Sequence, residues 1–272
     1  MNVPGITLNN GVVMPALGLG VYAPKHNSEV QQAVESALEL GCRLIDTASV
    51  YGNEREVAQA IRASGLNATD IFVTTKVWND QQGYDQTLWA FDQSLTRLGL
   101  DVVDLYLIHW PNGTDRLGSW RALETLYAQG RARAIGVSNF YPHHLDELLA
   151  VANVVPAVNQ IEVSPYCYRP DVMAYCHEKN IRVEGYAPLV RGQKQDDPRL
   201  IALAETYGIS TYQVLVRWSL QQGVITIPKS VKKDRIQHNF DVFDFELLPD
   251  DMAMLNTFYD NTRVAPDPTN LP

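Results

Sequence analysis

Four polar residues of the kinds used in proton transfer stand where short apolar runs end. Asp46, Lys76 and His109 each close such a run, and Tyr51 follows the first of them by a few residues. A free tyrosine has a pKa of about 10, so a neighbouring ammonium that lowers this pKa would make it a better general acid. We predict that Asp46 orients Lys76 and that Lys76 lowers the pKa of Tyr51. His109 would position a substrate carbonyl oxygen, which Tyr51 then protonates.

One such residue at a strand end is usually structural, and an Asp–Lys pair alone is a weak sign of an active site. The set of four is a stronger sign, but it lacks a hydride donor. The cysteines, Cys42, Cys167 and Cys176, are odd in number and widely spaced, which predicts neither a disulfide framework nor a zinc site. A nicotinamide cofactor would therefore have to supply the hydride.

Other strand-end residues offer a place for that cofactor. Tyr186 can stack on a nicotinamide ring, and Ser138, Asn139 and Gln160 carry groups that can bind its carboxamide. Residues 229–235 form the densest basic patch of the chain and follow the last apolar run, where barrels commonly hold phosphate at a helix start. The patch favours NADPH over NADH, although a solvated helix start would have the same composition.

The elements that must position these residues alternate along the chain. Apolar runs typical of strands occupy residues 16–20, 43–47, 71–76, 103–109, 132–139, 157–162, 181–186 and 224–229. Amphipathic segments typical of helices occupy residues 28–40, 54–63, 86–98, 120–129, 142–151, 170–179 and 212–221. This order predicts an α/β fold, a (β/α)8 TIM barrel, in which all strands direct their carboxyl ends toward one mouth.

Residues 6–14 read as a β-hairpin with an Asn-Gly turn, outside the repeat and covering one mouth of the barrel. No composition shift divides the chain, so residues 1–272 are expected to form a single domain. A net charge of −9 argues against nucleic-acid and anionic membrane partners. The start of the chain has no signal-like pattern and no apolar stretch approaches a membrane span, so we expect a cytoplasmic protein, and a monomer because no exposed apolar stripe stands out.

Several segments, in order, resemble the aldo-keto reductase family, from about residue 6 to about residue 248. They are LIDTA (44–48), YGNE (51–54), TTKVW (74–78), DLYLIHWP (104–111), IGVSNF (135–140), NQIE (159–162) and IPKSV (227–231). The likeness is greatest to the compact prokaryotic 2,5-diketo-D-gluconate reductase type. It implies a catalytic tetrad of Asp46, Tyr51, Lys76 and His109. It also implies an NADPH site made of Gly20, Val21, Ser138, Asn139, Gln160, Tyr186, Pro188, Leu189, Lys229, Ser230, Val231, Lys232, Arg235 and Asn239.

The substrate is expected to be a small carbonyl compound: a keto acid, a diketo sugar acid, a methylglyoxal-like dicarbonyl or a range of aldehydes. Tyr22, Trp78 and Trp110 are the expected aromatic lining of an open pocket, although each taken singly could be packing. After Pro188-Leu189 the family often has Gly-X-Gly, whereas this chain has Val190-Arg191-Gly192, and Arg191 would attract an acidic substrate. His238 stands where many relatives have Glu near the adenine.

Three other interpretations are open. Gly18, Gly20 and Ala23 match the dinucleotide fingerprint G-x-G-x-x-A, with Asp46 at the end of the next strand, but Pro24 and the polar residues 25–27 separate the glycines from the helix. A class I aldolase-like barrel would use Lys76 as a Schiff-base nucleophile without nicotinamide. A sensor or regulatory subunit would bind NADPH with little turnover.

Overall fold

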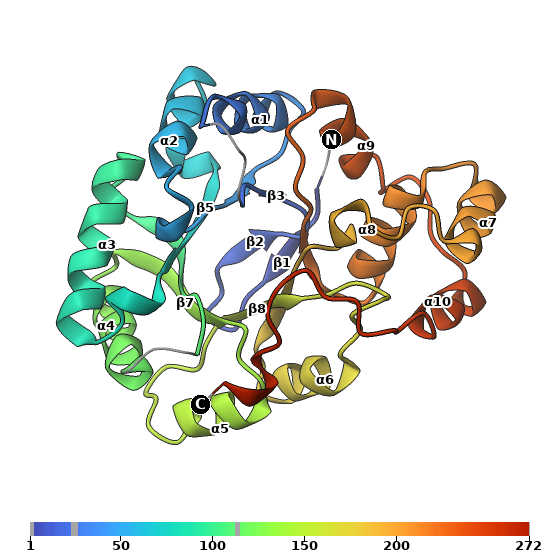
Figure 1. Cartoon of the computed structure of the whole chain (residues 1–272). Helices are drawn as coiled ribbons and strands as arrows, with labels where there is room; N and C mark the ends of the chain where they lie inside the picture. The colour runs from blue at the N-terminus through green and yellow to red at the C-terminus, as the bar shows by residue number, and fades with distance from the viewer. Residues whose placement is uncertain (1–2, 23–26, 112–114, 272) are drawn as a thin grey trace.

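Eight parallel strands follow one another around a closed barrel (Figure 1). The computed structural model describes residues 3–22, 27–111 and 115–271. The strands are β3 (Leu19–Gly20), β4 (Leu44–Asp46), β5 (Phe72–Val77), β6 (Val103–Ile108), β7 (Ala132–Ser138), β8 (Val158–Glu162), β9 (Arg182–Tyr186) and β10 (Ile225–Ile227). The barrel closes between its first and last segments, because the Gly18 amide donates to the Thr226 carbonyl at 2.9 Å and the Thr226 amide donates to the Ala16 carbonyl at 2.9 Å. The predicted (β/α)8 fold is confirmed.

Helices surround the barrel in Figure 1. They are α1 (Asn27–Glu39), α2 (Glu54–Ala63), α3 (Tyr84–Leu98), α4 (Arg116–Ala128), α5 (Pro142–Leu149), α6 (Pro170–Glu178), α7 (Pro198–Tyr207), α8 (Thr211–Gln221), α9 (Lys233–Phe240) and α10 (Pro249–Asn256). Each predicted helix is present, α2 with the predicted bounds and the others with ends shifted by a few residues. Of the other helices, α9 was expected only as a helix start at the basic residues 229–235, and α7 and α10 were not predicted, although each of these two begins with a proline, which is favoured in the first turn. None of the helices in the described ranges is long and apolar enough to cross a membrane.

Two layers of apolar side chains hold this arrangement together. One layer lies between the strands and the helices, with Ile45, Tyr106 and Val137 buried against helix residues such as Phe91 and Leu123. The other fills the barrel interior. Because strand residues alternate between the two layers, most strand positions are apolar on both faces, and the strands read as largely continuous apolar runs in the sequence. Polar side chains such as Lys76 and Glu184 interrupt the inner face toward the carboxyl ends.

The N-terminal hairpin closes the amino-end mouth of the barrel. Its strands, β1 (Gly5–Thr7) and β2 (Val13–Pro15), pair antiparallel, and Gly11 has a φ of 86° in the turn. Met14 packs into the interior cluster beside Leu44 and Leu105. The Arg182 side chain, at the start of β9, donates to the carbonyl of Thr7 at 3.2 Å. The carboxyl-end mouth is therefore the end at which a site can form.

The glycine pattern at the start of the barrel has a packing role. A Cβ on Gly18 would lie 2.4 Å from Cγ of Leu44, and one on Gly20 would lie 3.0 Å from the carbonyl oxygen of Ile227. Helix α1 begins only at Asn27, and residues 23–26, which include Ala23 and Pro24 of the fingerprint, lie outside the described residues. These glycines belong to a barrel strand that packs closely against its neighbours, not to a dinucleotide-binding turn.

Candidate active site

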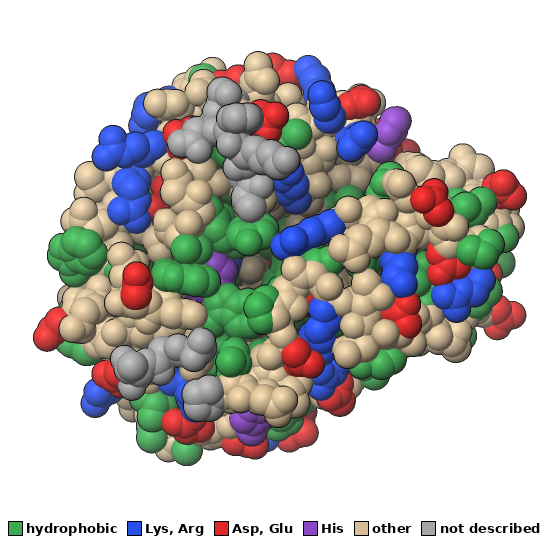
Figure 2. Space-filling view, viewed as in Figure 1, with side chains coloured by type: hydrophobic (Ala, Val, Ile, Leu, Met, Phe, Trp, Pro, Cys, Tyr) green, Lys and Arg blue, Asp and Glu red, His purple; other side chains and the backbone are tan. Residues whose placement is uncertain are grey.

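The barrel brings the four predicted proton-transfer residues together at its carboxyl-end mouth. Asp46 is the last residue of β4, Lys76 is the penultimate residue of β5, and His109 directly follows β6. Tyr51 ends a short 3-10 turn after β4, the segment Ser49–Tyr51. Figure 2 shows a hollow at the centre of this face, with hydrophobic side chains around it and a histidine inside.

Lys76 and Asp46 form a buried ion pair at the base of the site. The Lys76 side chain is fully buried, and its ammonium donates to Oδ1 and Oδ2 of Asp46 at 2.7 and 2.8 Å and to the carbonyl of Thr47 at 2.9 Å. An ammonium has three hydrogens, so these acceptors use all of them. A Schiff-base nucleophile must be a neutral amine with a free lone pair, so this geometry does not support the aldolase interpretation.

Tyr51 and His109 lie above this pair. The Lys76 ammonium is 5.2 Å from the centroid of the Tyr51 ring, and the Tyr51 and His109 rings meet edge to face at 5.6 Å. Burial, and then the negative charge of Asp46, raises the pKa of Tyr51 well above its usual value. The pKa of Tyr51 is therefore raised on balance and not lowered as expected, because burial and the charge of Asp46 outweigh the ammonium 5.2 Å from the ring. Tyr51 carries its proton at neutral pH, as a proton donor must.

His109 is held as a neutral imidazole. Burial, and then the nearby charge of Lys76, lowers the pKa of His109 well below 6.5. Its Nδ1 is buried and has no hydrogen-bond partner among the described residues. A neutral ring carries one N–H, so His109 can donate a single hydrogen bond to a substrate oxygen without adding a charge.

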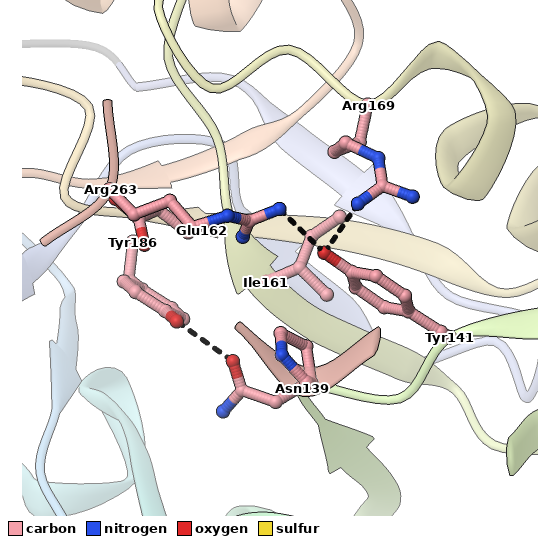
Figure 3. Close-up of a pocket in the computed structure, with 8 residues that line it drawn as sticks. Asn139, Tyr141, Ile161, Glu162, Arg169, Tyr186 and Arg263 are labelled. Atoms are coloured by element: carbon pink, nitrogen blue, oxygen red, sulfur yellow. Dashed lines mark hydrogen bonds between the residues drawn. The ribbon is translucent and has the colours of Figure 1, made fainter. Parts of the chain in front are cut away.

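The residues predicted to hold nicotinamide lie beside these four and form one hydrogen-bonded group, and Figure 3 shows its Tyr186–Asn139 contact. The Tyr186 hydroxyl donates to Oδ1 of Asn139 at 2.8 Å. Nδ2 of Asn139 donates to the carbonyl of His109 at 3.0 Å, and the Ser138 hydroxyl donates to the carbonyl of Gln160 at 2.8 Å. Asn139 has a φ of 64°, a left-handed conformation that asparagine tolerates better than most residues. Each residue is thus fixed at the mouth by a partner on a neighbouring strand or loop.

The predicted phosphate-binding segment leads into α9. Lys229, Lys232 and Arg235 are exposed, and none of them forms an ion pair with a residue in the described ranges. The Ser230 hydroxyl accepts from the amide of Lys232 at 3.2 Å. Two other residues implied for the cofactor are half-buried: Val231, and Leu189 in the loop after β9. The remaining ones are buried, namely Gly20, Val21, Pro188 and Asn239.

Two of the three predicted aromatic residues have ring contacts with the site. Tyr22 is 52% exposed and meets the Tyr51 ring at 5.0 Å, and Trp78 meets the His109 ring at 5.0 Å. Trp110 is half-buried directly after His109, and the loop beyond it, residues 112–114, lies outside the described residues. The Arg191 guanidinium lies 5.6 Å from the centroid of the Tyr22 ring. His238 is exposed on α9.

The C-terminal segment also contributes to the site, which the sequence reasoning missed. Figure 1 shows it crossing the mouth and ending beside α5. The Glu162 carboxylate accepts from the amides of Val264 and Ala265 at 2.7 and 3.2 Å, and Arg263 donates to the Tyr141 hydroxyl at 3.1 Å. Glu162, Arg263 and Tyr141, with Tyr186, are among the residues that line a cavity of about 10 Å³, shown in Figure 3. The mouth is therefore less open than the open pocket expected from the sequence.

The fold and this site define an α/β barrel with a buried ion pair and a group of hydroxyl, amide and imidazole donors at its carboxyl-end mouth. The family model described as "Aldo/keto reductase family" matches residues 16–260. The chain belongs to the aldo/keto reductase family.

Its relatives match over nearly the whole chain. An uncharacterized oxidoreductase, YtbE, of Bacillus subtilis is 49% identical over 97% of this chain and 96% of its own length. The glyoxal reductase of the same organism is 47% identical over 98% of this chain and 96% of its own. Among solved structures, a Bombyx mori aldo-keto reductase in complex with NADP has a TM-score of 0.93 and 40% identity, covering 98% of this chain and 96% of that one.

Proposed function

We propose that this protein reduces aldehydes and ketones to alcohols with NADPH, with Tyr51 as the general acid and Asp46, Lys76 and His109 as the rest of the catalytic set. The observation that carries the proposal is the position of the Tyr51 and His109 rings. They meet edge to face over the buried Asp46–Lys76 pair and lie beside the Tyr186–Asn139 group. One relative is a glyoxal reductase, and a structural neighbour was solved in complex with NADP. The unit proposed to act is the whole barrel, residues 1–272, as a monomer.

The described residues fit a phosphorylated nicotinamide cofactor. Tyr186 presents a ring at the mouth, and Ser138, Asn139 and Gln160 offer hydroxyl and amide groups there. At the other end, exposed cations precede the first turn of α9, whose free amide groups favour an anion. When bound, NADPH supplies the hydride.

The chain's own residues then handle the charge and the proton. The N–H of neutral His109 positions the substrate oxygen, and the Tyr51 hydroxyl transfers its proton to that oxygen as negative charge develops there. Lys76 stays charged because Asp46 holds it, and its ammonium 5.2 Å from the Tyr51 ring opposes the negative charge left on the phenolate. Tyr22 and Trp78 shield the reacting group from water on the open side.

The substrate class is a small carbonyl compound, and we include keto acids, diketo sugar acids and methylglyoxal-like dicarbonyls. The likeness to the 2,5-diketo-D-gluconate reductase type supports the sugar acids, and the glyoxal reductase relative supports the dicarbonyls. The mouth itself favours compact substrates, because the C-terminal segment crosses it and aromatic rings flank His109.

The test is NADPH oxidation by the wild type and by Tyr51→Phe with aldehydes, α-keto acids, methylglyoxal and 2,5-diketo-D-gluconate. We expect the variant to lose at least about a hundredfold in kcat, the usual scale of general acid catalysis, with NADPH affinity retained. Tight NADPH binding by a wild type that turns over none of these compounds would favour the sensor interpretation. Absence of NADPH binding would refute the cofactor assignment.

A further inference from the structure

A second buried carboxyl group lies next to the Asp46–Lys76 pair. Glu184, in the middle of β9, is fully buried. Nε2 of Gln160 donates to Oδ2 of Asp46 at 2.8 Å and to Oε2 of Glu184 at 2.7 Å. One amide group therefore bridges the two carboxyl groups, and no residue predicted from the sequence accounts for the second one.

Glu184 forms no ion pair with any residue in the described ranges. The charged and titratable groups that face it are Asp46 on β4, Lys76 on β5 and Tyr51 beyond β4, while its neighbours in register are Gln160 on β8 and the apolar Ile225 on β10. All three ammonium hydrogens of Lys76 go to Asp46 and Thr47.

One oxygen of Glu184 also lacks a partner. Its Oε1 is buried without a hydrogen bond to any residue that the structure describes. An ionised carboxylate in this place would be a buried charge with one oxygen unsatisfied, which costs far more than a neutral carboxyl group in the same place. Burial, and then the charge of Asp46, raises the pKa of Glu184 to about 8.

We propose that Glu184 is a positioning residue that keeps its proton at neutral pH, so that the buried cluster remains electrically neutral and the amide of Gln160 is held in one orientation. The orientation follows from the two contacts: a flipped amide would set its oxygen against the Asp46 carboxylate. Gln160 must therefore direct its N–H group to the two acids, which leaves its carbonyl oxygen as the acceptor for a bound carboxamide. This part of the inference rests on the proposed function.

The protonation state affects the chemistry through charge. With Glu184 neutral, the cluster contains one cation and one anion, because His109 is also neutral. Loss of the Glu184 proton leaves a net negative charge beside Asp46, and this charge further raises the pKa of Tyr51. It also opposes the negative charge that develops on the substrate oxygen. Carbonyl reduction should therefore weaken as Glu184 ionises.

The first experiment needs no turnover: infrared titration of the free protein, comparing wild type, Glu184→Gln and the control Glu205→Gln. Glu205 is an exposed acid on α7. We expect the carbonyl band of a protonated carboxylic acid at pH 7 in the wild type and the control, lost with a midpoint near pH 8, and absent from Glu184→Gln. A wild type without this band at pH 7 overturns the proposal, even if the variant does not fold. A band of unchanged intensity in Glu184→Gln assigns the proton to another acid and also overturns it, whereas burial also raises the pKa of Glu162 and Asp104, so only the part of the band lost in the variant belongs to Glu184.

The second experiment tests positioning. The alkaline limb of kcat/KM should move to higher pH in Glu184→Gln and stay in place in Glu205→Gln. Glu184→Leu, which is neutral but offers Gln160 no acceptor, should bind NADPH about fivefold more weakly than Glu184→Gln, the usual effect of one lost hydrogen bond. Equal affinities of the two variants, or an unmoved alkaline limb, would overturn the positioning role. A protein that does not oxidise NADPH would refute the proposed function and leave the infrared result standing.

Discussion

Replacing Asp46 with asparagine should destabilise the barrel as well as inactivate it. The substitution keeps the size of the side chain but leaves the Lys76 ammonium, fully buried, without its counter-ion. Removing one partner of a buried pair typically costs about 3 to 5 kcal/mol. Domains are typically stable by about 5 to 15 kcal/mol, so this cost is a large fraction of the free energy of unfolding. For a chain of this length it corresponds to a fall in Tm of roughly 10 °C.

Thermal unfolding of cofactor-free protein measures this change directly. Asp92→Asn is the matched control, because Asp92 pairs with Arg131 at 2.6 Å but both side chains are at least one-third exposed. Such surface pairs contribute less than about 1 kcal/mol. The double variant Asp46→Asn with Lys76→Met should recover most of the loss, since it removes the stranded charge. The reasoning is refuted if Asp46→Asn unfolds within a degree or two of Asp92→Asn, or if the double variant is no more stable than Asp46→Asn.

Three further predictions follow from charge. Arg235→Ala should weaken NADPH binding about tenfold and NADH binding by less than twofold, because a charge-assisted contact to phosphate contributes about 1.5 kcal/mol or more; equal losses by fluorescence titration would contradict the phosphate role. Arg191→Ala should lower kcat/KM for α-keto acids several-fold more than for uncharged aldehydes, and an unchanged ratio would argue against recruitment of acids. His109 is held neutral, so folding becomes less favourable as pH falls below 6.5; the fall in Tm between pH 6.5 and about 5 should be shallower in His109→Asn.

The barrel was predictable because strand-like and helix-like patterns of apolar residues alternate regularly along the chain. Buried strands read as short apolar runs, and the intervening segments have the amphipathic pattern of helices, so α2 matches its predicted bounds, 54–63. The ends of the strands were less predictable. We could predict that three of the polar residues, Asp46, Lys76 and His109, lie at one mouth. Polar residues that close apolar runs are conspicuous in a sequence, and parallel strands must bring them to the same end of the barrel.

Glu184 illustrates what such reasoning misses. It sits inside an apolar run, two residues before the end of β9, and Tyr186 was the polar residue taken to close that run. The signal that could have found it is a carboxylate in a buried strand with no nearby basic residue on the same strand apart from the exposed Arg182. The contacts of the C-terminal segment could not be predicted from the sequence either. The hydrogen bond from the Val264 amide to the Glu162 carboxylate connects positions about a hundred residues apart, and it depends on how the loops fold.

The one wrong electrostatic prediction changes how the pH dependence should be understood. Although the Lys76 ammonium lies 5.2 Å from the Tyr51 ring, burial and the charge of Asp46 raise the pKa of Tyr51 on balance. A raised pKa is compatible with an acid in this reaction, since the alkoxide formed from a carbonyl is a much stronger base than a phenolate. It also means that Tyr51 keeps its proton well into the alkaline range. We therefore expect the ionisation of Glu184, and not that of Tyr51, to set the alkaline limb, which should move to higher pH in Glu184→Gln.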